Sequence, residues 1–273
     1  MKRKGFWLMA LVLCVCFPVI GSLAQSPPLG QSAAESAQHG FPEMMNLHGD
    51  KLADGEFIQW TENGILHVKI TYHFADGRTI EEKTSLRQTP QLVQQAWSWT
   101  ESKNGGLLRH FEVDFKAGKA VAEKRERGKV KRWSEAVKIE LGRTFAGFGF
   151  VLAIEQERER LVKGEKIQLR AVGFIPKPKV VPAEIFYHGL DQMSMAGRIV
   201  QGDRFTIHPE VSALARVFVA AKDTQIWLTT PPAASFLRWE GPLVEAQDPI
   251  IRVDRIPGEH SGTAEPASKL STP

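Results

Sequence analysis

Alternation of apolar and polar residues with a period of two is the feature that most constrains the fold of this chain. From Leu66 to Phe74, apolar side chains occupy every second position, with histidine, lysine and threonine between them. A strand with this pattern buries one face and exposes the other to water. The alternation recurs over 111–115 and 137–141. The sequence therefore predicts a sheet with one buried face, which is typical of antiparallel rather than parallel sheets.

Short turn signals separate the alternating segments. Asn63-Gly64 and Asp76-Gly77 suit two-residue hairpins, because both residues of each pair tolerate the positive φ of a type I′ turn. Asn104-Gly105, Ala117-Gly118 and Arg127-Gly128 predict further turns. Strands joined by such short connections pair as antiparallel neighbours. The first half of the chain is therefore predicted to be a meander.

One segment has helical spacing instead. Thr144 is a candidate N-cap for a helix over about 144–162, and Gly164 is a candidate stop signal. We expect this helix to pack on the open side of the sheet. Strand signals then resume over 167–174, 185–188, 204–208, 215–221 and 224–229. The prolines at 176, 178 and 182 predict an edge or an extended crossing rather than a central strand.

The predicted fold class is all-β: a curved antiparallel meander or half-open barrel with one packed α-helix, in a single domain over 51–255. An outer-membrane barrel would also alternate. The helix and the proline-interrupted segments argue against that alternative. Residues 25–50 are rich in Ser, Ala, Gln and Pro and predict a flexible lead-in. Residues 256–273 have no apolar period and predict a disordered tail.

The first 24 residues have the pattern of an export signal. Lys2, Arg3 and Lys4 precede an apolar stretch that ends in the small-x-small sequence Ser22-Leu23-Ala24. We expect cleavage after Ala24 and a periplasmic or secreted protein, with no integral membrane span after cleavage. An uncleaved anchor is the alternative, because the apolar stretch approaches the length that spans a bilayer. Lipidation is disfavoured, since neither cysteine follows a small residue.

Cleavage of this signal would change the composition that bears on function. The whole chain has two cysteines and a formal net charge of +4. Cys14, Cys16 and three basic residues lie within the first 24 residues, so the remainder is near-neutral and free of cysteine. This composition excludes disulfides and thiol catalysis in the mature chain, and it gives no electrostatic reason to expect a nucleic-acid partner.

No group of residues in the sequence has the spacing of a known catalytic or metal site. The histidines lack metal-binding spacings, and His67 and His73 would lie about 20 Å apart along one strand. Glu81 and Glu82 point to opposite strand faces and cannot act together. Gly147-Phe148-Gly149 resembles half of a dinucleotide-binding loop, but close helix–sheet packing explains it better. We predict no catalytic residue, no cofactor and no metal.

Tryptophans and one basic run are the remaining candidates. Trp97 and Trp99 share a face of one strand, and Trp227 and Trp239 lie near the C-terminus. These four rings are candidates for lining an apolar cleft, although core packing is the commoner use of such residues. The basic run over 123–132 could contact anionic lipids or polymers. A solvated hairpin whose charges prevent edge-to-edge pairing explains this run better.

The C-terminal segments carry a resemblance. Residues 226–232 (IWLTTPP) and 236–242 (FLRWEGP), with Asp76-Gly77-Arg78, 81–88 and 109–114, look like parts of an uncharacterised family of exported bacterial β-sheet proteins. The wider similarity is to periplasmic half-barrels, the lipoprotein carriers of the LolA and LolB type. That resemblance implies a concave apolar face that holds an acyl chain and needs no cofactor. This chain departs from it in its greater length and mid-chain helix.

The sequence thus favours non-enzymatic binding in the bacterial envelope, of a lipid-like or amphipathic ligand or of an envelope protein. Two alternatives stay open. One is a hydrolase acting on an envelope polymer, which predicts a cleft holding His188 or His208 beside a carboxylate. The other is a structural or assembly protein that pairs through a sheet edge. The oligomeric state is left open.

Overall fold

A computed structural model describes residues 38–175, 177–210, 222–230 and 235–255, which lie in one compact unit. These residues form one helix, α1 (Gly149–Val162), and sixteen strands. The strands are β1 (Gln38–Gly40), β2 (Pro42–Asn46), β3 (Lys51–Glu62), β4 (Ile65–Phe74), β5 (Arg78–Arg87), β6 (Val93–Lys103), β7 (Gly106–Asp114), β8 (Lys119–Glu126), β9 (Lys129–Ala136), β10 (Thr144–Phe145), β11 (Ile167–Ile175), β12 (Lys177–Met195), β13 (Arg198–Pro209), β14 (Thr224–Thr229), β15 (Phe236–Pro242) and β16 (Ile250–Arg255). The predicted signal (1–24), tail (256–273) and strand over 215–221 lie outside the described residues.

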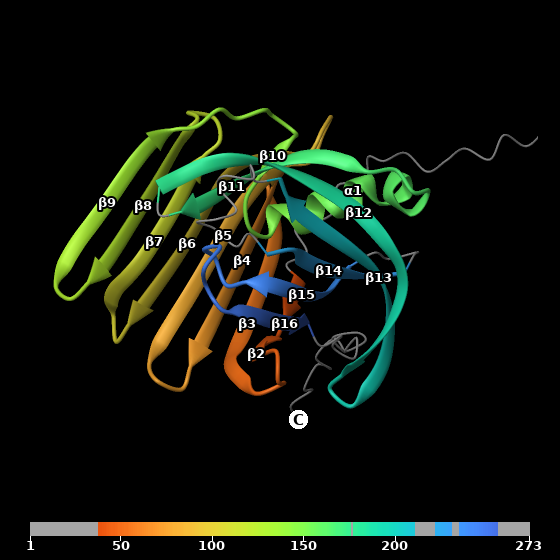
Figure 1. The fold of residues 1–273 in the computed structure, drawn as a ribbon, viewed down its shortest axis with the longest axis horizontal. Helices are drawn as coiled ribbons and strands as arrows, with labels where there is room; N and C mark the ends of the chain where they lie inside the picture. Colours follow the sequence, from red (N-terminus) through yellow and green to blue (C-terminus); the bar gives the residue numbers. More distant parts are fainter. Residues whose placement is uncertain (1–37, 176, 211–221, 231–234, 256–273) are drawn as a thin grey trace, which may run out of the picture. The chain divides into compact units, whose positions relative to one another are not determined.

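All sixteen strands belong to one curved sheet (Figure 1). Its order is β10-β11-β12-β13-β14-β15-β16-β2-β3-β4-β5-β6-β7-β8-β9, and β1 pairs with β3 beside this path. Neighbours are antiparallel except β10 and β11. Two meanders are thus joined where β16 pairs with β2. The predicted all-β fold, with a curved antiparallel sheet and one packed helix, is confirmed.

Strong curvature follows from the connection between the two edges of the sheet. β9 and β10 are the outermost strands, yet only residues 137–143 lie between them in the chain. Fifteen strands laid flat at about 4.8 Å spacing would be about 67 Å wide. The connection can reach at most about 28 Å. The sheet must therefore curl so that its ends approach, and Lys177 on β12 lies 3.5 Å from Glu135 on β9.

The hairpins form where the turn signals predicted them. Asn63-Gly64 has φ values of 50° and 75°, and Asn104-Gly105 has 49° and 79°, as a type I′ turn requires. Arg127-Gly128 has the same conformation. Asp76-Gly77 differs, because only Gly77 has a positive φ. Asp76 instead accepts a hydrogen bond from the Arg78 amide (3.1 Å).

The helix begins later than predicted. Thr144 is not its N-cap but part of β10, and its hydroxyl accepts a hydrogen bond from the Glu140 amide (2.9 Å). The helix starts at Gly149, and its N-cap residue Phe148 makes no side-chain cap bond. It ends at Val162, before Gly164 at φ 90°. Its buried residues join the main core, and Figure 1 shows α1 inside the curve of the sheet.

Three other boundaries need correction or refinement. Residues 38–46 form β1 and β2, so the predicted flexible lead-in of 25–50 is wrong for this part. Met44, which lies in β2, is almost fully buried. The predicted strand over 137–141 is wrong: this segment is an irregular connection, in which Val137 and Ile139 pack against the core while Leu141 is exposed. Pro178 and Pro182 lie in the part of β12 that pairs with β11 alone, an edge position as predicted.

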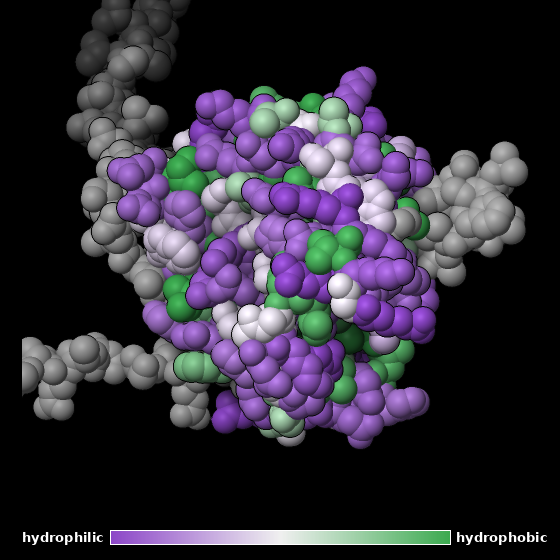
Figure 2. Space-filling model, turned by 90° about the vertical axis from the view of Figure 1, so that its left-hand side faces the viewer, coloured by the Kyte–Doolittle hydropathy of each residue, from purple (hydrophilic) through white to green (hydrophobic). Residues whose placement is uncertain are grey.

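Apolar side chains of the inner sheet face and α1 form one large core. The outer surface is polar. The side of the molecule seen in Figure 2 is mostly hydrophilic, with hydrophobic residues in small separate groups. The basic run over 123–132 forms the end of β8, the turn and the start of β9. The predicted solvation holds for the edge strand β9, which exposes Lys129, Lys131 and Arg132, but not for Lys124, which is buried. Charged side chains on an edge strand oppose pairing with another sheet.

Candidate functional site

The core encloses a partly open cavity with a volume of about 230 Å³. Its walls come from β2 and β4–β6, from β11–β16, and from the residues just before and within α1. Sheet register explains which residues reach it. Ile70, Glu82 and Trp99 are direct cross-strand partners on β4, β5 and β6 and form one row on the inner face. The curvature of the sheet brings segments more than 100 residues apart to this single cavity.

Three of the four candidate tryptophans line this cavity. Trp97 and Trp99 are almost fully buried, and Trp239 on β15 is partly buried. Trp227 lies elsewhere, in a small cluster with Met193, Met195 and Leu237, where its indole N–H donates to Asp191 (3.0 Å). A ligand-binding role for any of the four stays a prediction.

A single carboxyl, that of Glu82, lies among the apolar walls. Its Oε1 accepts two hydrogen bonds, from the Trp97 indole N–H (2.8 Å) and from the Phe148 backbone N–H (2.7 Å). Some of its surface remains accessible because it faces the cavity. Removal from bulk water is nevertheless the largest effect and raises the pKa of this carboxyl, against the two hydrogen bonds. Burial, with a smaller contribution from the nearby charge of Glu82, raises the pKa of Tyr72.

The same carboxyl holds the start of α1. Phe148 is the N-cap residue, so Glu82 satisfies an N–H at the end of the helix, where a negative charge is also favoured by the helix dipole. Gln94 acts alongside, accepting a hydrogen bond from the Ala146 amide (2.8 Å). Side chains from β5 and β6 therefore replace the local cap that was predicted at Thr144.

Gly147 makes this arrangement sterically possible. Its φ is +50°, and a Cβ at this position would collide with the Glu82 carboxylate and the Trp97 indole. A Cβ at Gly149 would lie 2.6 Å from the Gln94 side chain. The interpretation of Gly147-Phe148-Gly149 as a close helix–sheet contact is therefore confirmed.

Glu82 is the residue that the sequence analysis missed as a candidate. Glu81 and Glu82 do point to opposite faces: Glu81 pairs with Lys69 and Lys83 outside, whereas Glu82 faces the cavity. The sequence feature that could have identified Glu82 is its position in the alternation of buried and exposed residues along β5. Glu82 lies two residues from Ile80 on the alternation that ends at Leu86, so an acid occupies the apolar face.

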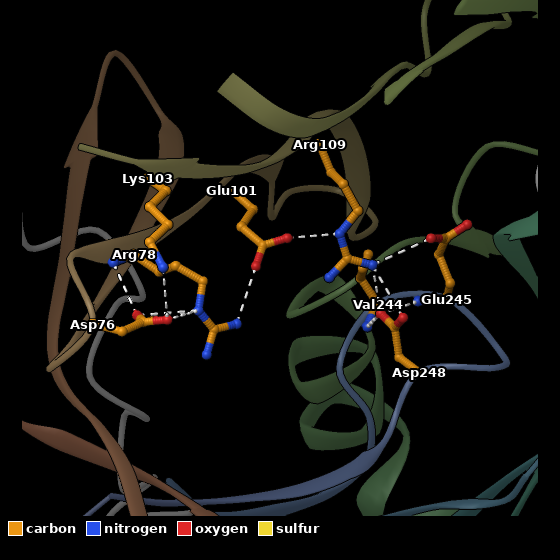
Figure 3. Close-up of polar contacts among 8 residues, drawn as sticks. All are labelled: Asp76, Arg78, Glu101, Lys103, Arg109, Val244, Glu245 and Asp248. Atoms are coloured by element: carbon orange, nitrogen blue, oxygen red, sulfur yellow. Dashed lines mark hydrogen bonds and ion pairs between the residues drawn. The ribbon is translucent and has the colours of Figure 1, made fainter. Parts of the chain in front are cut away.

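Buried ion pairs fix one wall of the cavity. Leu243, Val244 and Ala246, between β15 and β16, line it. The neighbouring carboxylates of Glu245 and Asp248 lie 3.2 and 2.9 Å from Nη1 of Arg109 on β7 (Figure 3).

Further contacts extend this network across the sheet. The Nε of Arg109 donates to Glu101 (2.7 Å), and its guanidinium lies 5.0 Å from the Trp99 ring centroid. Lys124 lies 2.5 Å from Glu245. Asp248 also accepts hydrogen bonds from the backbone of its own segment. The network therefore ties residues 243–248 to β6, β7 and β8, directly beside a cavity tryptophan.

The histidines do not contribute to the cavity. The His208 Nδ1 lies 2.7 Å from Asp223, but both side chains are about 40% exposed. Their chain neighbours Ile207, Pro209, Lys222 and Thr224 line the cavity, so strand alternation puts this pair on the outer face. His188 contacts Thr206 (2.7 Å) and is not part of the cavity wall. The arrangement that the hydrolase alternative requires is not found among the described residues.

Within the described residues, no group of three or more His, Cys, Asp or Glu side chains is placed to hold a metal ion. No helix formed by these residues is long and apolar enough to cross a membrane.

Comparison with protein-family models, with curated proteins and with solved structures found no match for the chain. The resemblance to the exported β-sheet family and to the LolA and LolB carriers therefore stays a prediction.

Proposed function

We propose that this protein is exported to the bacterial envelope and binds a small lipid-like or amphipathic ligand, without catalysing a reaction. The observation that carries the proposal is the apolar cavity of about 230 Å³ within the core. Protein interiors rarely contain voids larger than a water molecule. At about 10–15 Å³ for each water-sized group, this one has room for roughly 15–23 such groups. That is the size of a medium-length acyl chain with a head group.

The composition of the walls supports an amphipathic rather than a polar ligand. Tryptophan, phenylalanine and aliphatic side chains make up most of the lining, and Glu82 and Lys222 are its only charged members. Ligand sites commonly combine such apolar walls with a few polar groups that orient the ligand. Lys222 is exposed, so Glu82 is the ionisable acid or base that lies within the cavity beside the polar residues Tyr72 and Thr224.

Titration with dodecanol, followed by tryptophan fluorescence, tests the proposal, with native mass spectrometry to detect ligands that co-purify. Ala171→Phe places a ring in the cavity wall, and Ala136→Phe makes the same change on the exposed edge strand β9. We expect the wild-type protein and Ala136→Phe to bind dodecanol with equal affinity, and Ala171→Phe to bind at least tenfold more weakly. Absence of any bound or co-purified amphiphile in the wild-type protein would refute the proposal.

A further inference from the structure

Glu82 differs from the fully buried carboxylates Asp203, Glu245 and Asp254 in having no ion-pair partner in the described part of the chain. Asp203 pairs with Arg158, and Asp254 lies 2.5 Å from Arg238. Glu245 contacts both Arg109 and Lys124. Among the described residues, no Lys, Arg or His lies within ion-pair distance of Glu82. Buried charges in proteins are normally paired, because an isolated one has lost its hydration without compensation.

The hydrogen bonds of Glu82 are also uneven. Both donors, the Trp97 indole and the Phe148 amide, bind Oε1. Within the part of the chain that the structure describes, no donor binds Oε2. A carboxylate can accept about four hydrogen bonds. The carboxyl is therefore oriented by the protein through one oxygen and retains accepting capacity at the other, in a residue that lines the cavity.

Aromatic rings lie beside this carboxyl. Trp99 is the direct cross-strand partner of Glu82, and Trp97 donates to it. Phe148 and Phe174 line the same cavity. The faces of such rings attract organic cations, most strongly where water is excluded. A hard metal ion fits poorly, because one carboxyl supplies too few of the six or more oxygens that calcium or magnesium requires.

We propose that the cavity selects an amphiphile with a primary ammonium head group, which forms an ion pair with Oε2 of Glu82 while its chain occupies the apolar walls. The inference rests on the proposed function and specifies its ligand class. It assigns Glu82 two roles: holding the start of α1 through Oε1 and recognising the ligand through Oε2. General electrostatic attraction does not explain such a preference, because the whole chain has a formal net charge of +4.

Three probes with the same chain and different head groups test the inference at pH 7.5. Dodecylammonium and dodecanoate are titrated below their micelle concentrations, and dodecanol is titrated below its solubility limit. We expect dodecylammonium to bind the wild-type protein at least tenfold more tightly than dodecanol, and dodecanoate to bind more weakly than either. The preference is measured on the unmodified protein, so it does not depend on whether a variant folds.

Two variants locate the preference. Glu82→Gln keeps an oxygen to accept the bonds from Trp97 and Phe148 but removes the charge, so the ammonium-to-alcohol ratio should fall to within about threefold while dodecanol affinity is retained. Glu81→Gln removes a carboxylate from the outer face of the same strand and should keep the wild-type ratio.

The possible failures are distinguishable. Equal affinity for dodecylammonium and dodecanol, preference for dodecanoate, or an ammonium preference that survives Glu82→Gln would overturn the inference and leave the proposed function standing. Failure of all three probes to bind would overturn both.

Discussion

Replacing Glu155 with Gln should change how the stability of this protein depends on pH. Glu155 lies on α1, and burial raises the pKa of its carboxyl from 4.5 to about 7, against the opposing charge of Arg255. The folded protein therefore holds a proton on Glu155 between these pH values, where the unfolded chain has released it. This contribution to stability is fully present below about pH 4.5 and is lost as the pH rises through about 7.

The size of the effect follows from the pKa shift. Each unit corresponds to about 1.4 kcal/mol, so the shift is equivalent to about 3.5 kcal/mol at most. The side chain is half-buried, which lowers the expected value to about 2–3 kcal/mol. Glutamine resembles the neutral carboxyl. The variant and the wild-type protein should thus be about equally stable at pH 4.5, and the variant should be more stable by about 2–3 kcal/mol at pH 8.

Urea unfolding followed by circular dichroism at several pH values between 4.5 and 8 measures this difference. Glu82 also has a raised pKa, but it is present in both proteins and cancels from the comparison. Glu159→Gln alters an exposed residue of the same helix and should leave the wild-type profile unchanged. Parallel stability profiles for wild type and Glu155→Gln would refute the reasoning.

Two further predictions concern the cavity wall and the contact between α1 and the sheet. Arg109→Ala leaves three carboxylates without their shared guanidinium. It should lower the free energy of urea unfolding by about 3–5 kcal/mol and speed hydrogen exchange over 243–249. The control Lys131→Ala removes an exposed ion pair and should lower the free energy of unfolding by less than about 1 kcal/mol. An equal loss in both variants would contradict the role given to Arg109. Gly147→Ala should lower the thermal stability of the protein more than Gly64→Ala. Both glycines have a positive φ, so a side chain at either position costs about 1–2 kcal/mol of stability. Of these two positions, only at Gly147 would the new Cβ also collide with other side chains. Equal costs would show that the collision is relieved without loss.

The strands and hairpins were readable from the sequence because their signals are local. Burial alternates along β4 as the apolar pattern predicts, and Asn-Gly pairs mark the turns before β4 and β7. The predictions that were wrong concern segments whose conformation depends on contacts with residues far away in the sequence. Thr144 has the chemistry of an N-cap, but Glu82 and Gln94 on other strands satisfy the groups at the start of α1. The segment over 137–141 alternates like a strand yet crosses between the two sheet edges without pairing.

In the candidate site, too, the sequence identifies residue types, whereas the contacts between distant residues appear only in the structure. The sequence identifies the tryptophans as candidates for lining an apolar cleft. It does not show that Trp239 and Trp99 line one cavity while Trp227 lies elsewhere. Glu82 was seen only as one half of an acidic pair. Whether its side chain points inward depends on which face of the strand is buried. Whether it has a cationic partner depends on which residues of distant strands lie opposite it.

By itself, the sequence determined the antiparallel strands, their turns and the presence of a single helix, because hydrophobic periodicity and turn chemistry act between residues a few positions apart. Only the tertiary structure decided that the two ends of the sheet approach each other, that β16 pairs with β2, and that a carboxyl lies within an apolar cavity. These features arise from contacts between residues that are far apart in the chain, and neither periodicity nor propensity specifies which distant surfaces meet.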